Sequence, residues 1–349
     1  MSEPRVVFVG ETMPGSRTPQ RVRAFRSLGW GVVLVPTNRP GRTFEDAPTL
    51  MERLRYRLRR PYDEAGANTA LLAAVEEGCD LVWIENARVL KPETLAAIKR
   101  AVPRSSLVWY AEDDMMNPRL GSVWVDRALP LFDLWLTTKS FNARQEEMPK
   151  RGVRRVVFVD NSYDPEVHRP LALSAEEKLA FGADITFVGT YEAPRARSLL
   201  HLAQAGLSVR VWGNGWSKLA GAHALLRVEE RPVYDDDYAR TINASRINLA
   251  FLRKANRDLQ TCRTVEIPAC GGFMLHEASP EAERLFARDT EAGYFSGDDE
   301  LVKACRSWLA DDERRGAVAA AGRRRAQTGH THADRLRLIL RLAGLTGGN

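Results

Sequence analysis

The sequence contains few of the residues that build redox centres and metal sites. Its 349 residues include four cysteines and six histidines, without a CxxC pair or an HExxH motif. The cysteines therefore indicate buried, reduced thiols, and not a disulfide framework or a zinc site. His330 and His332 would point about 200° apart on a helix, so they are a poor metal pair. We expect no metal and no other cofactor.

Several sequence signatures of other protein classes are also missing. No run approaches 18 apolar residues, so no transmembrane helix is predicted. The P-loop pattern GxxxxGK[ST] and the GxSxG nucleophile elbow do not occur. Gly213-Asn214-Gly215 begins a GxGxxG pattern, but Lys218 stands in place of the third glycine. The start MSEPRVVFVG lacks a basic stretch followed by an apolar one, so we expect no secretory signal and a cytoplasmic location.

The charge balance is mildly basic. The formal net charge is +6, from 51 Lys and Arg against 45 Asp and Glu, and the excess is spread along the chain. Such a balance suits an anionic small molecule or an anionic surface, and we expect no nucleic-acid partner. Five arginines lie within Met51–Arg60. We interpret this stretch as a solvated helix face, with an anionic acceptor or a peripheral membrane contact as the alternative.

The first half of the chain alternates short apolar runs with amphipathic stretches. Such runs are typical of parallel strands buried on both faces. The predicted strands are Val6–Val9, Val32–Val35, Leu81–Ile84, Leu107–Tyr110, Leu134–Thr137 and Val156–Val159. The predicted helices between them are Thr18–Leu28, Ala67–Glu77 and Pro92–Ala101. Trp83 and Trp109 lie within apolar runs and are predicted core residues. Asn161–Pro170, with two prolines, is interpreted as a linker.

A second alternation follows this linker. The predicted strands are Ile185–Val188, Val209–Trp212, Ile247–Phe251 and Phe273–His276, and the predicted helices are Ala193–Gln204, Thr261–Ala269, Asp299–Ala310 and Asp312–Thr328. The pattern predicts an α/β protein with two Rossmann-like parallel-sheet domains. We place these domains at residues 1–165 and 166–330, with a helix and tail at 331–349 that pack back across the linker.

Loops that follow strands are candidate binding sites, because ligands of open α/β sheets bind at the carboxyl ends of strands. Gly10 ends the first strand, where it serves a tight turn or lets a ligand diphosphate approach. Asp113 and Asp114 follow Leu107–Tyr110 and could cap a helix or act as an acceptor-side acid or base pair. Asp235, Asp236 and Asp237 follow Pro232 and are interpreted as a solvated acidic cap.

The stretch Asn256–Glu277 carries the most chemistry. Thr261, Arg263 and Thr264 stand at a predicted helix start, where hydroxyls, a guanidinium and free N–H groups would suit a diphosphate. Glu266 lies about one turn further along, and its carboxylate could accept two hydrogen bonds from a ribose diol. An ordinary amphipathic helix closed by Gly271-Gly272 is the alternative on these residues alone.

Residues from about 155 to 340 resemble a known family. The chain looks like the GT-B glycosyltransferases of the CgeB-like, spore-maturation-type group, which are related to the large retaining family of sugar-nucleotide transferases. The segments that carry the resemblance are Asp184–Thr190, Arg195, Val211–Trp216, Arg263–Leu275, Glu283–Phe286, Asp298–Leu301, Ala321–Arg323 and His330–His332 with Arg335. The resemblance implies a GT-B fold, in which two Rossmann-like domains face a central cleft.

The resemblance also implies the parts of a donor site. The related family has two acidic residues, the first beside the donor sugar and the second on the ribose, and Asp258 and Glu266 stand at these positions. Aspartate at the first position is a departure, since its side chain is shorter. Arg263, Thr264 and Lys254 would face the diphosphate, and the fixed cation would replace a metal. The remaining implied donor contacts are Thr261, Gly189, Thr190, Arg195, Gly213, Asn214, Gly215, Trp216 and Gly10.

The main hypothesis is therefore a glycosyltransferase that moves a hexosyl group from a UDP- or GDP-sugar to an unidentified acceptor, with retention and without a metal. Asp258, Arg263, Asp113 and Asp114 are its candidate catalytic residues. One alternative is a sugar-nucleotide epimerase on the same scaffold. The other is a non-catalytic protein that binds nucleotides or glycans, which the departure at Asp258 favours.

Overall fold

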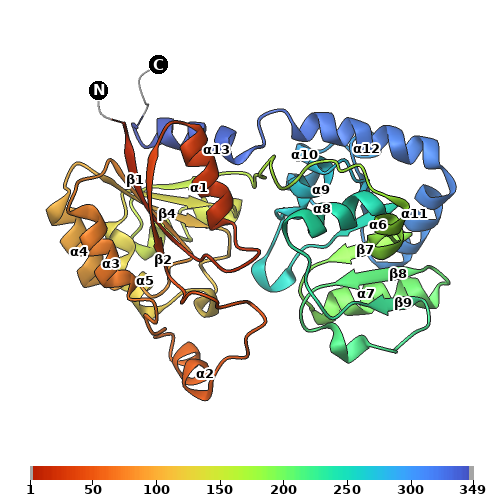
Figure 1. Cartoon of the computed structure of the whole chain (residues 1–349), viewed down its shortest axis with the longest axis horizontal. Coiled ribbons are helices and arrows are strands. Elements are labelled where there is room, and N and C mark those ends of the chain that lie inside the picture. The colour runs from red at the N-terminus through yellow and green to blue at the C-terminus, as the bar shows by residue number, and fades with distance from the viewer. Residues whose placement is uncertain (1–2, 346–349) are drawn as a thin grey trace. The chain divides into compact units, whose positions relative to one another are not determined.

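The chain forms two compact units, which the computed structural model describes over residues 3–345. Unit 1 comprises Met1–Asp160 and His332–Asn349, and unit 2 comprises Asn161–Thr331 (Figure 1). Each unit contains one six-stranded parallel sheet with helices between its strands. The expectation of two Rossmann-like α/β domains is confirmed. The predicted domain limits after residues 165 and 330 stay a prediction. A domain is a part of the chain that could fold alone, and compactness by itself does not show this.

Unit 1 contains a sheet with strand order β2-β1-β3-β4-β5-β6. Its strands are β1 (Arg5–Gly10), β2 (Gly31–Pro36), β3 (Leu81–Glu85), β4 (Ser106–Ala111), β5 (Leu134–Thr137) and β6 (Val156–Phe158). Its α-helices are α1 (Thr18–Ser27), α2 (Leu50–Arg57), α3 (Ala67–Val75), α4 (Pro92–Ala101), α5 (Val123–Ala128) and α13 (His332–Leu342). Short 3₁₀ turns are η1 (Pro118–Leu120), η2 (Leu129–Leu131), η3 (Ser140–Ala143) and η4 (Pro149–Arg151).

Unit 2 contains a sheet with strand order β12-β11-β10-β7-β8-β9. Its strands are β7 (Ile185–Val188), β8 (Val209–Trp212), β9 (Leu226–Val228), β10 (Ile247–Ala250), β11 (Met274–Glu277) and β12 (Gly293–Phe295). Its helices are α6 (Ala175–Phe181), α7 (Ala193–Gln204), α8 (Asp235–Ala244), α9 (Arg263–Ala269), α10 (Pro280–Leu285), α11 (Asp298–Ala310) and α12 (Asp312–Ala326), with η5 (Trp216–Leu219) and η6 (Lys254–Asn256).

Every apolar run expected to form a strand does form one, because burial on both faces selects continuous apolar sequence. Trp83 and Trp109 are fully buried, as predicted, and Trp109 stacks on Trp135 with ring centroids 5.1 Å apart. The short strands β9 and β12 were not predicted. Each has three residues and lies at an edge of the sheet, so its apolar pattern is too short to be distinctive. Among the described residues, no helix is long and apolar enough to cross a bilayer.

The segment 161–170, interpreted as a linker, follows the boundary between the two units and is mostly buried. Asn161, Ser162, Asp164 and His168 are each at most 5% exposed, so most of the segment lies inside unit 2. The Asn161 backbone N–H donates to the side-chain oxygen of Gln260 at 3.0 Å. Turn-forming residues and prolines indicate irregular backbone, and here that backbone is held by buried side chains. A sequence pattern of this kind does not reveal whether the irregular backbone is exposed.

Helix α13, at the far end of the chain, belongs to unit 1. Its side chains Leu336, Ile339 and Leu340 pack in one apolar cluster with Phe25 of α1. His332, at the start of α13, is buried, and its Nε2 lies 3.3 Å from Oε1 of Gln20. The last helix of the chain therefore completes the core of the first unit.

Candidate functional site

The loops that follow β7 and β8 hold each other at the carboxyl edge of the unit 2 sheet. The indole Nε1 of Trp216 donates to the Gly189 carbonyl oxygen at 2.7 Å, and the Gly189 N–H donates to the Trp212 carbonyl at 2.9 Å. Gly213 has a φ of 140°, and a Cβ there would collide with the Gly189 carbonyl. Gly213 is therefore needed for the close approach of the two backbones, while a Cβ on Gly189 would meet the Phe187 ring. Trp216 is 0% exposed and supports this loop pair.

Three arginines gather beside these loops, and we call Arg195, Arg253 and Arg263 the arginine cluster. Arg195 lies on α7, is 7% exposed, and donates through Nη1 to the Thr190 carbonyl at 3.2 Å. Burial lowers the pKa of Arg195, with Glu192 opposing, and repulsion from Arg253 and Arg263 lowers that pKa further. Like charges within mutual reach are costly unless an anion joins them. The cluster is therefore chemically suited to a polyanion.

Two carboxylates and one carbonyl position the other members of the cluster. Arg253 follows β10, and its Nε donates to Glu192 Oε1 at 2.9 Å while its side chain stays 41% exposed. Arg263 opens α9, donates through Nε to the Val188 carbonyl at 3.2 Å, and pairs through Nη1 with Glu266. Its guanidinium lies 4.6 Å from the Tyr238 ring centroid. Arg263 thus joins the start of α9 to the carboxyl end of β7.

Glu266 is buried and has a neighbouring side chain at each carboxylate oxygen. Oε2 accepts from Arg263, and Oε1 lies 3.6 Å from Nε2 of His168. The His168 ring is buried at an edge-to-face angle to Tyr238, with ring centroids 5.6 Å apart. A carboxylate can accept hydrogen bonds from both hydroxyls of a ribose diol. The ribose role of Glu266 stays a prediction.

Thr264 is engaged inside the protein, 0% exposed on α9. Its hydroxyl lies 2.8 Å from Nε2 of His276 on β11 and accepts from the Thr261 N–H at 3.0 Å. Because Nδ1 of His276 donates to the Glu277 carbonyl, at 2.6 Å, the neutral ring accepts the Thr264 proton at Nε2. Burial lowers the pKa of His276 to about 4. The Thr264 hydroxyl therefore fastens α9 to the sheet, and its diphosphate contact stays a prediction.

The helix start itself differs from the expectation. Helix α9 begins at Arg263, two residues later than predicted, with Cys262 as its N-cap. Thr261 precedes the helix, and its hydroxyl oxygen is buried without a hydrogen-bond partner within unit 2. With seven residues and Pro268 near its end, α9 is short. We therefore assign the site's positive charge to arginine side chains and not to a helix terminus.

Asp258 is held by its own loop. It is 7% exposed, and its carboxylate accepts from Nδ2 of Asn256 at 2.7 Å and from the Arg253 N–H at 3.3 Å. The charge of Asp258 also acts on Arg195, opposing the fall of the arginine's pKa. The structure thus brings Asp258 to the arginine cluster. A sugar contact by this shorter acid stays a prediction.

The remaining donor-side candidates are loop residues and one largely exposed lysine. Lys254 is 62% exposed on its side chain and pairs with Oε1 of Glu277. Thr190 and Gly215 are exposed, and Asn214 is half-buried with its carbonyl accepting the Tyr191 N–H at 2.9 Å. All of these residues follow strands of unit 2 at the same sheet edge. Their contacts with a donor stay predictions.

At the carboxyl edge of the unit 1 sheet, a pocket is lined mainly by carboxylates and aromatic rings. The lining residues are Glu85, Asn86, Trp109, Tyr110, Ala111, Glu112, Asp113 and Met115. Glu11, which follows β1, accepts from Asn86 at 2.9 Å, and its pKa is raised, first by burial, with Asp113 and Glu112 adding to the rise. Half-buried Asp113 belongs to this pocket. An acidic pocket of this kind accepts hydrogen bonds from hydroxyl or ammonium groups.

Asp114 and Gly10 serve the backbone near this pocket. Asp114 is 3% exposed, and its Oδ1 accepts from Nδ2 of Asn142 at 2.9 Å and from the Met116 N–H at 3.1 Å. A Cβ on Gly10 would collide with the Thr18 hydroxyl, so this glycine lets α1 pack closely against the end of β1. Its approach to a diphosphate stays a prediction. The pair of aspartates therefore splits into one pocket residue and one loop-supporting residue. Acid or base roles for either residue stay predictions.

Sequence reasoning missed several residues that shape both edges. In unit 2 these residues are His168, Glu192, Tyr238 and Arg253, and in unit 1 they are Glu11, Arg21, Glu85 and Glu112. Arg21 is 2% exposed, pairs with Glu85 and Glu112, and lies 4.3 Å from the Tyr110 ring centroid. Glu11, Glu112 and Arg253 carry the same signal as the predicted residues, namely a charged side chain just after a strand. His168 gave no such signal, because it lies 98 positions from Glu266 in an irregular segment.

No three His, Cys, Asp or Glu side chains among residues 3–345 are arranged to hold a metal ion. The four cysteines are thiols and not disulfides, and burial raises the pKa of Cys305 to about 12. That pKa keeps this thiol protonated at neutral pH.

Comparison with known proteins identifies the fold. Residues 195–341 match a family model described as glycosyl transferase-like, and no curated protein sequence matches the chain. Sucrose-phosphate synthase from Thermosynechococcus elongatus is similar in structure, with a TM-score of 0.68, 13% identity, and coverage of 98% of this chain and 99% of that one. Anabaena HepE in complex with UDP-glucose gives a TM-score of 0.63 at 13% identity, covering 98% and 100%.

An alpha-glucosyltransferase in complex with UDP-glucose and DNA containing an abasic site gives a TM-score of 0.65 at 13% identity, covering 99% of this chain and 100% of that one. These likenesses extend over both sheets of the chain. The chain therefore has the GT-B fold, as the resemblance implied.

Proposed function

We propose that this chain is a glycosyltransferase that moves a hexosyl group from a UDP- or GDP-sugar to an acceptor, in the cytoplasm. The glycosyl transferase-like segment and the GT-B fold support this proposal, as do structural neighbours whose complexes contain UDP or UDP-glucose. Membership of the CgeB-like group is part of the proposal. It rests on the motifs in the second half of the chain.

The arginine cluster is the observation that carries the proposal. Arg195 and Arg253 both face Glu192, at 3.7 and 2.9 Å, and Arg263 reaches the Val188 carbonyl at the end of β7. Ligands of open α/β sheets bind at this edge. Guanidinium groups match phosphate oxygens in geometry and stay charged at all relevant pH values. A nucleoside diphosphate supplies an anion that these guanidinium groups would bind.

The cluster also explains how the reaction would proceed without a metal. As the bond between the sugar and the diphosphate breaks, negative charge develops on the leaving diphosphate. Fixed positive charges near that position stabilise the transition state more than the ground state. Glu266 would hold the ribose, Asp258 would lie beside the donor sugar, and the product would keep the donor's anomeric configuration.

Unit 1 would supply the acceptor side. Asp113 lines the acidic pocket at the carboxyl edge of its sheet, where a carboxylate can hydrogen-bond to an acceptor hydroxyl. In a retaining reaction on the donor's front face, such a group orients the hydroxyl and need not remove its proton. The acceptor class proposed here is therefore a hydroxyl-bearing glycan, protein or small molecule.

Nucleotide binding by Glu266 variants tests this proposal. Calorimetry with UDP and GDP on Glu266→Ala should show affinity lower by about 10–150-fold, because charge-assisted hydrogen bonds to the ribose are lost. Glu229→Gln is the matched control, since Glu229 also binds an arginine, Arg210, at 2.6 Å, but outside the arginine cluster. Unchanged affinity in a folded Glu266→Ala protein would refute the ribose role.

Incubation with UDP- and GDP-sugars separates the proposed reaction from its alternatives. Slow release of free sugar from the donor is expected of a glycosyltransferase that lacks its acceptor. Formation of an isomeric sugar nucleotide would instead establish an epimerase. Binding of the donor with neither product would establish a non-catalytic binding protein.

A further inference from the structure

The connection between β2 and α3 is unusually long and carries a helix with no buried side chain. It spans residues 37–66, whereas strand-to-helix connections in such folds have about 2–6 residues. Helix α2 within it begins with a capping box between Thr49 and Glu52, and none of its residues is buried. Figure 1 shows α2 at the tip of this connection, away from the sheet of unit 1. Core packing does not account for this helix.

Exposed apolar side chains are concentrated on this connection. Seven of the nine large hydrophobic side chains exposed within residues 3–345 lie between positions 44 and 62. They are Phe44, Leu50, Met51, Leu54, Tyr56, Leu58 and Tyr62, and Leu50 reaches 83% exposure. Single exposed apolar residues are ordinary, but a concentration of this kind marks a binding surface.

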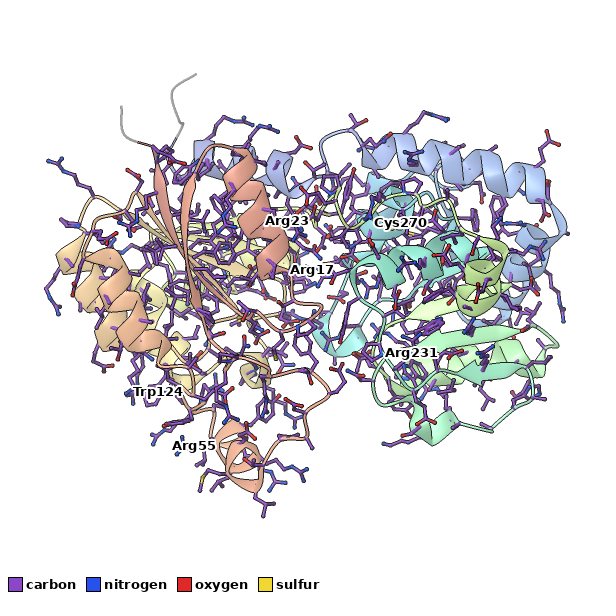
Figure 2. The ribbon with its side chains drawn as sticks, in the orientation of Figure 1. Arg17, Arg23, Arg55, Trp124, Arg231 and Cys270 are labelled. Carbon is purple, nitrogen blue, oxygen red and sulfur yellow. The ribbon has the colours of Figure 1, made fainter. Side chains whose placement is uncertain are left out.

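Arginines flank the apolar side chains along the helix. At about 100° per residue, Leu50, Met51, Leu54 and Leu58 fall within an arc of about 100°. Arg53 and Arg57 then fall on one side of this arc, and Arg55 falls on the other. We call these four apolar residues and three arginines the α2 surface. Figure 2 labels Arg55 on α2, where its guanidinium lies 4.6 Å from the Tyr62 ring centroid.

The base of the α2 surface is fixed to unit 1. Arg59, just after the helix, donates through Nε to the Pro118 carbonyl at 2.6 Å and through Nη2 to Asp126 at 2.7 Å. Its carbonyl accepts the Val123 N–H at 2.9 Å. The guanidinium of Arg60 lies 5.9 Å from the Trp124 ring centroid, and Figure 2 labels this tryptophan. The helix is therefore presented on a fixed base, which lowers the entropy lost on binding.

We infer that the α2 surface docks the chain on a membrane that contains anionic lipids. Leucine and methionine side chains insert at the boundary between headgroups and acyl chains, and the flanking arginines reach the lipid phosphates. Residues 50–60 carry five arginines against one glutamate, so the surface attracts an anionic leaflet. The inference does not depend on the proposed glycosyl transfer.

Charge and apolar exposure together favour this partner over two others. A second copy packed symmetrically on the same surface would bring two sets of arginines together, which like-charge repulsion opposes. A nucleic acid would match the arginines but would leave the exposed leucines in water. A lipid surface satisfies both kinds of side chain.

Sedimentation with vesicles tests the inference on the full chain without any donor. The probes are vesicles of phosphatidylcholine alone and vesicles with about 30% phosphatidylglycerol. We expect binding to the anionic vesicles, at least tenfold weaker binding to the neutral ones, and weakening as salt is raised. Arg53→Gln with Arg57→Gln should weaken anionic binding about 25-fold, at about fivefold per arginine. Leu50→Ser with Leu54→Ser should weaken it about tenfold.

Matched controls remove the same groups elsewhere. Leu179→Ser changes a leucine that is 82% exposed in unit 2, and Arg104→Gln with Arg324→Gln removes two exposed arginines outside the α2 surface. These controls should bind the anionic vesicles as the parent does. Equal binding to both vesicle types, or equal loss in the controls, would overturn the inference. So would a dimer, detected by light scattering, that Leu50→Ser with Leu54→Ser converts to a monomer without any vesicle binding.

Discussion

The two units use the same architecture and differ in the charged side chains at corresponding sheet edges. In unit 2 arginines meet Glu192 and Glu266, whereas carboxylates line the pocket of unit 1. At the carboxyl edge of unit 2, three arginines gather around the loops after β7 and β10. At the carboxyl edge of unit 1, Glu85, Glu112 and Asp113 line a pocket, and the pKa of nearby Glu11 is raised by burial. The parallel sheet determines where a site forms. The side chains after each strand determine which ligand that site accepts.

This contrast indicates that the two units bind different ligands: unit 2 suits a polyanion, and unit 1 suits a hydroxyl-bearing ligand. The guanidinium groups of the arginine cluster suit an anion, and the carboxylates of unit 1 repel an anion. The edge of unit 1 therefore disfavours the polyanion that the edge of unit 2 suits. The predictions below test this division by removing charge from one edge at a time.

Removing Arg263 should have the largest effect. Arg263→Ala should lower kcat by about 10²–10³-fold, because the leaving diphosphate loses a fixed positive charge in the transition state. Steady-state kinetics with a donor should show this loss, while affinity for the free nucleoside, which has no phosphate, should stay within about twofold. Arg263→Lys is the control, since it retains the charge and still compensates Glu266. A fall in nucleoside affinity equal to the fall in kcat would contradict the assignment.

Asp113 tests the acidic edge. Asp113→Asn preserves volume and removes the charge, so transfer should fall by about 10²-fold while donor binding stays within about twofold. Asp114→Asn is the informative partner, because this buried residue supports Asn142 and should reduce stability more than turnover. Transfer assays and calorimetry on both variants measure the two effects. Loss of donor binding in Asp113→Asn would contradict the assignment of Asp113 to the acceptor, because it would show that this residue contributes to the donor site.

Acid should weaken unit 2 through His276. Its pKa is about 4 in the folded protein against an ordinary 6.5, so only the unfolded chain takes up this proton as pH falls below 6.5. Stability is therefore complete above pH 6.5 and is lost toward pH 4, by about 2 kcal/mol at pH 5. Urea unfolding at pH 7 and pH 5 should show this loss in the parent and in the control His201→Gln. In His276→Gln the loss should be absent. The raised pKa of Glu11 in unit 1 acts in the opposite direction, because protonation then favours the folded state.

Chelation should have the smallest effect of all. If the arginine cluster carries the positive charge, turnover in EDTA should stay within about twofold of turnover in buffer. Assays with EDTA, and then with excess Mg²⁺ or Mn²⁺, measure this directly. Activity that disappears in EDTA and returns with either ion would show that a metal carries the charge instead.

The fold could be predicted from the sequence because its signals are local. Apolar runs such as Val6–Val9 and Ile185–Val188 are long enough to identify buried parallel strands, and each became a strand. The segment 161–170 could not be predicted in the same way, since burial of irregular backbone depends on side chains from distant positions. Asn161 bonds to Gln260, which lies 99 residues later in the chain.

The candidate site was predictable in part, for the same reason. Charged residues just after strands, such as Asp113, were found by position alone. Partners that meet across the fold, such as His168 with Glu266, depend on tertiary packing and leave no sequence pattern. Thr264 shows the same dependence on packing, because its sequence position gives no sign that its hydroxyl also contacts His276.

The return of α13 to unit 1 makes unit 2 an insertion within the first unit, with consequences for how the chain folds as it is synthesised. Residues 5–158 form a complete sheet early, but α1 lacks its covering helix until residues 332–342 emerge. Until then the apolar surface around Phe25 remains exposed. Exposed apolar surface of this kind makes incompletely folded chains prone to aggregation. Unit 2, which is continuous in sequence, has no such dependence. Truncation before α13 would therefore damage the first part of the chain to be made and leave the later part intact.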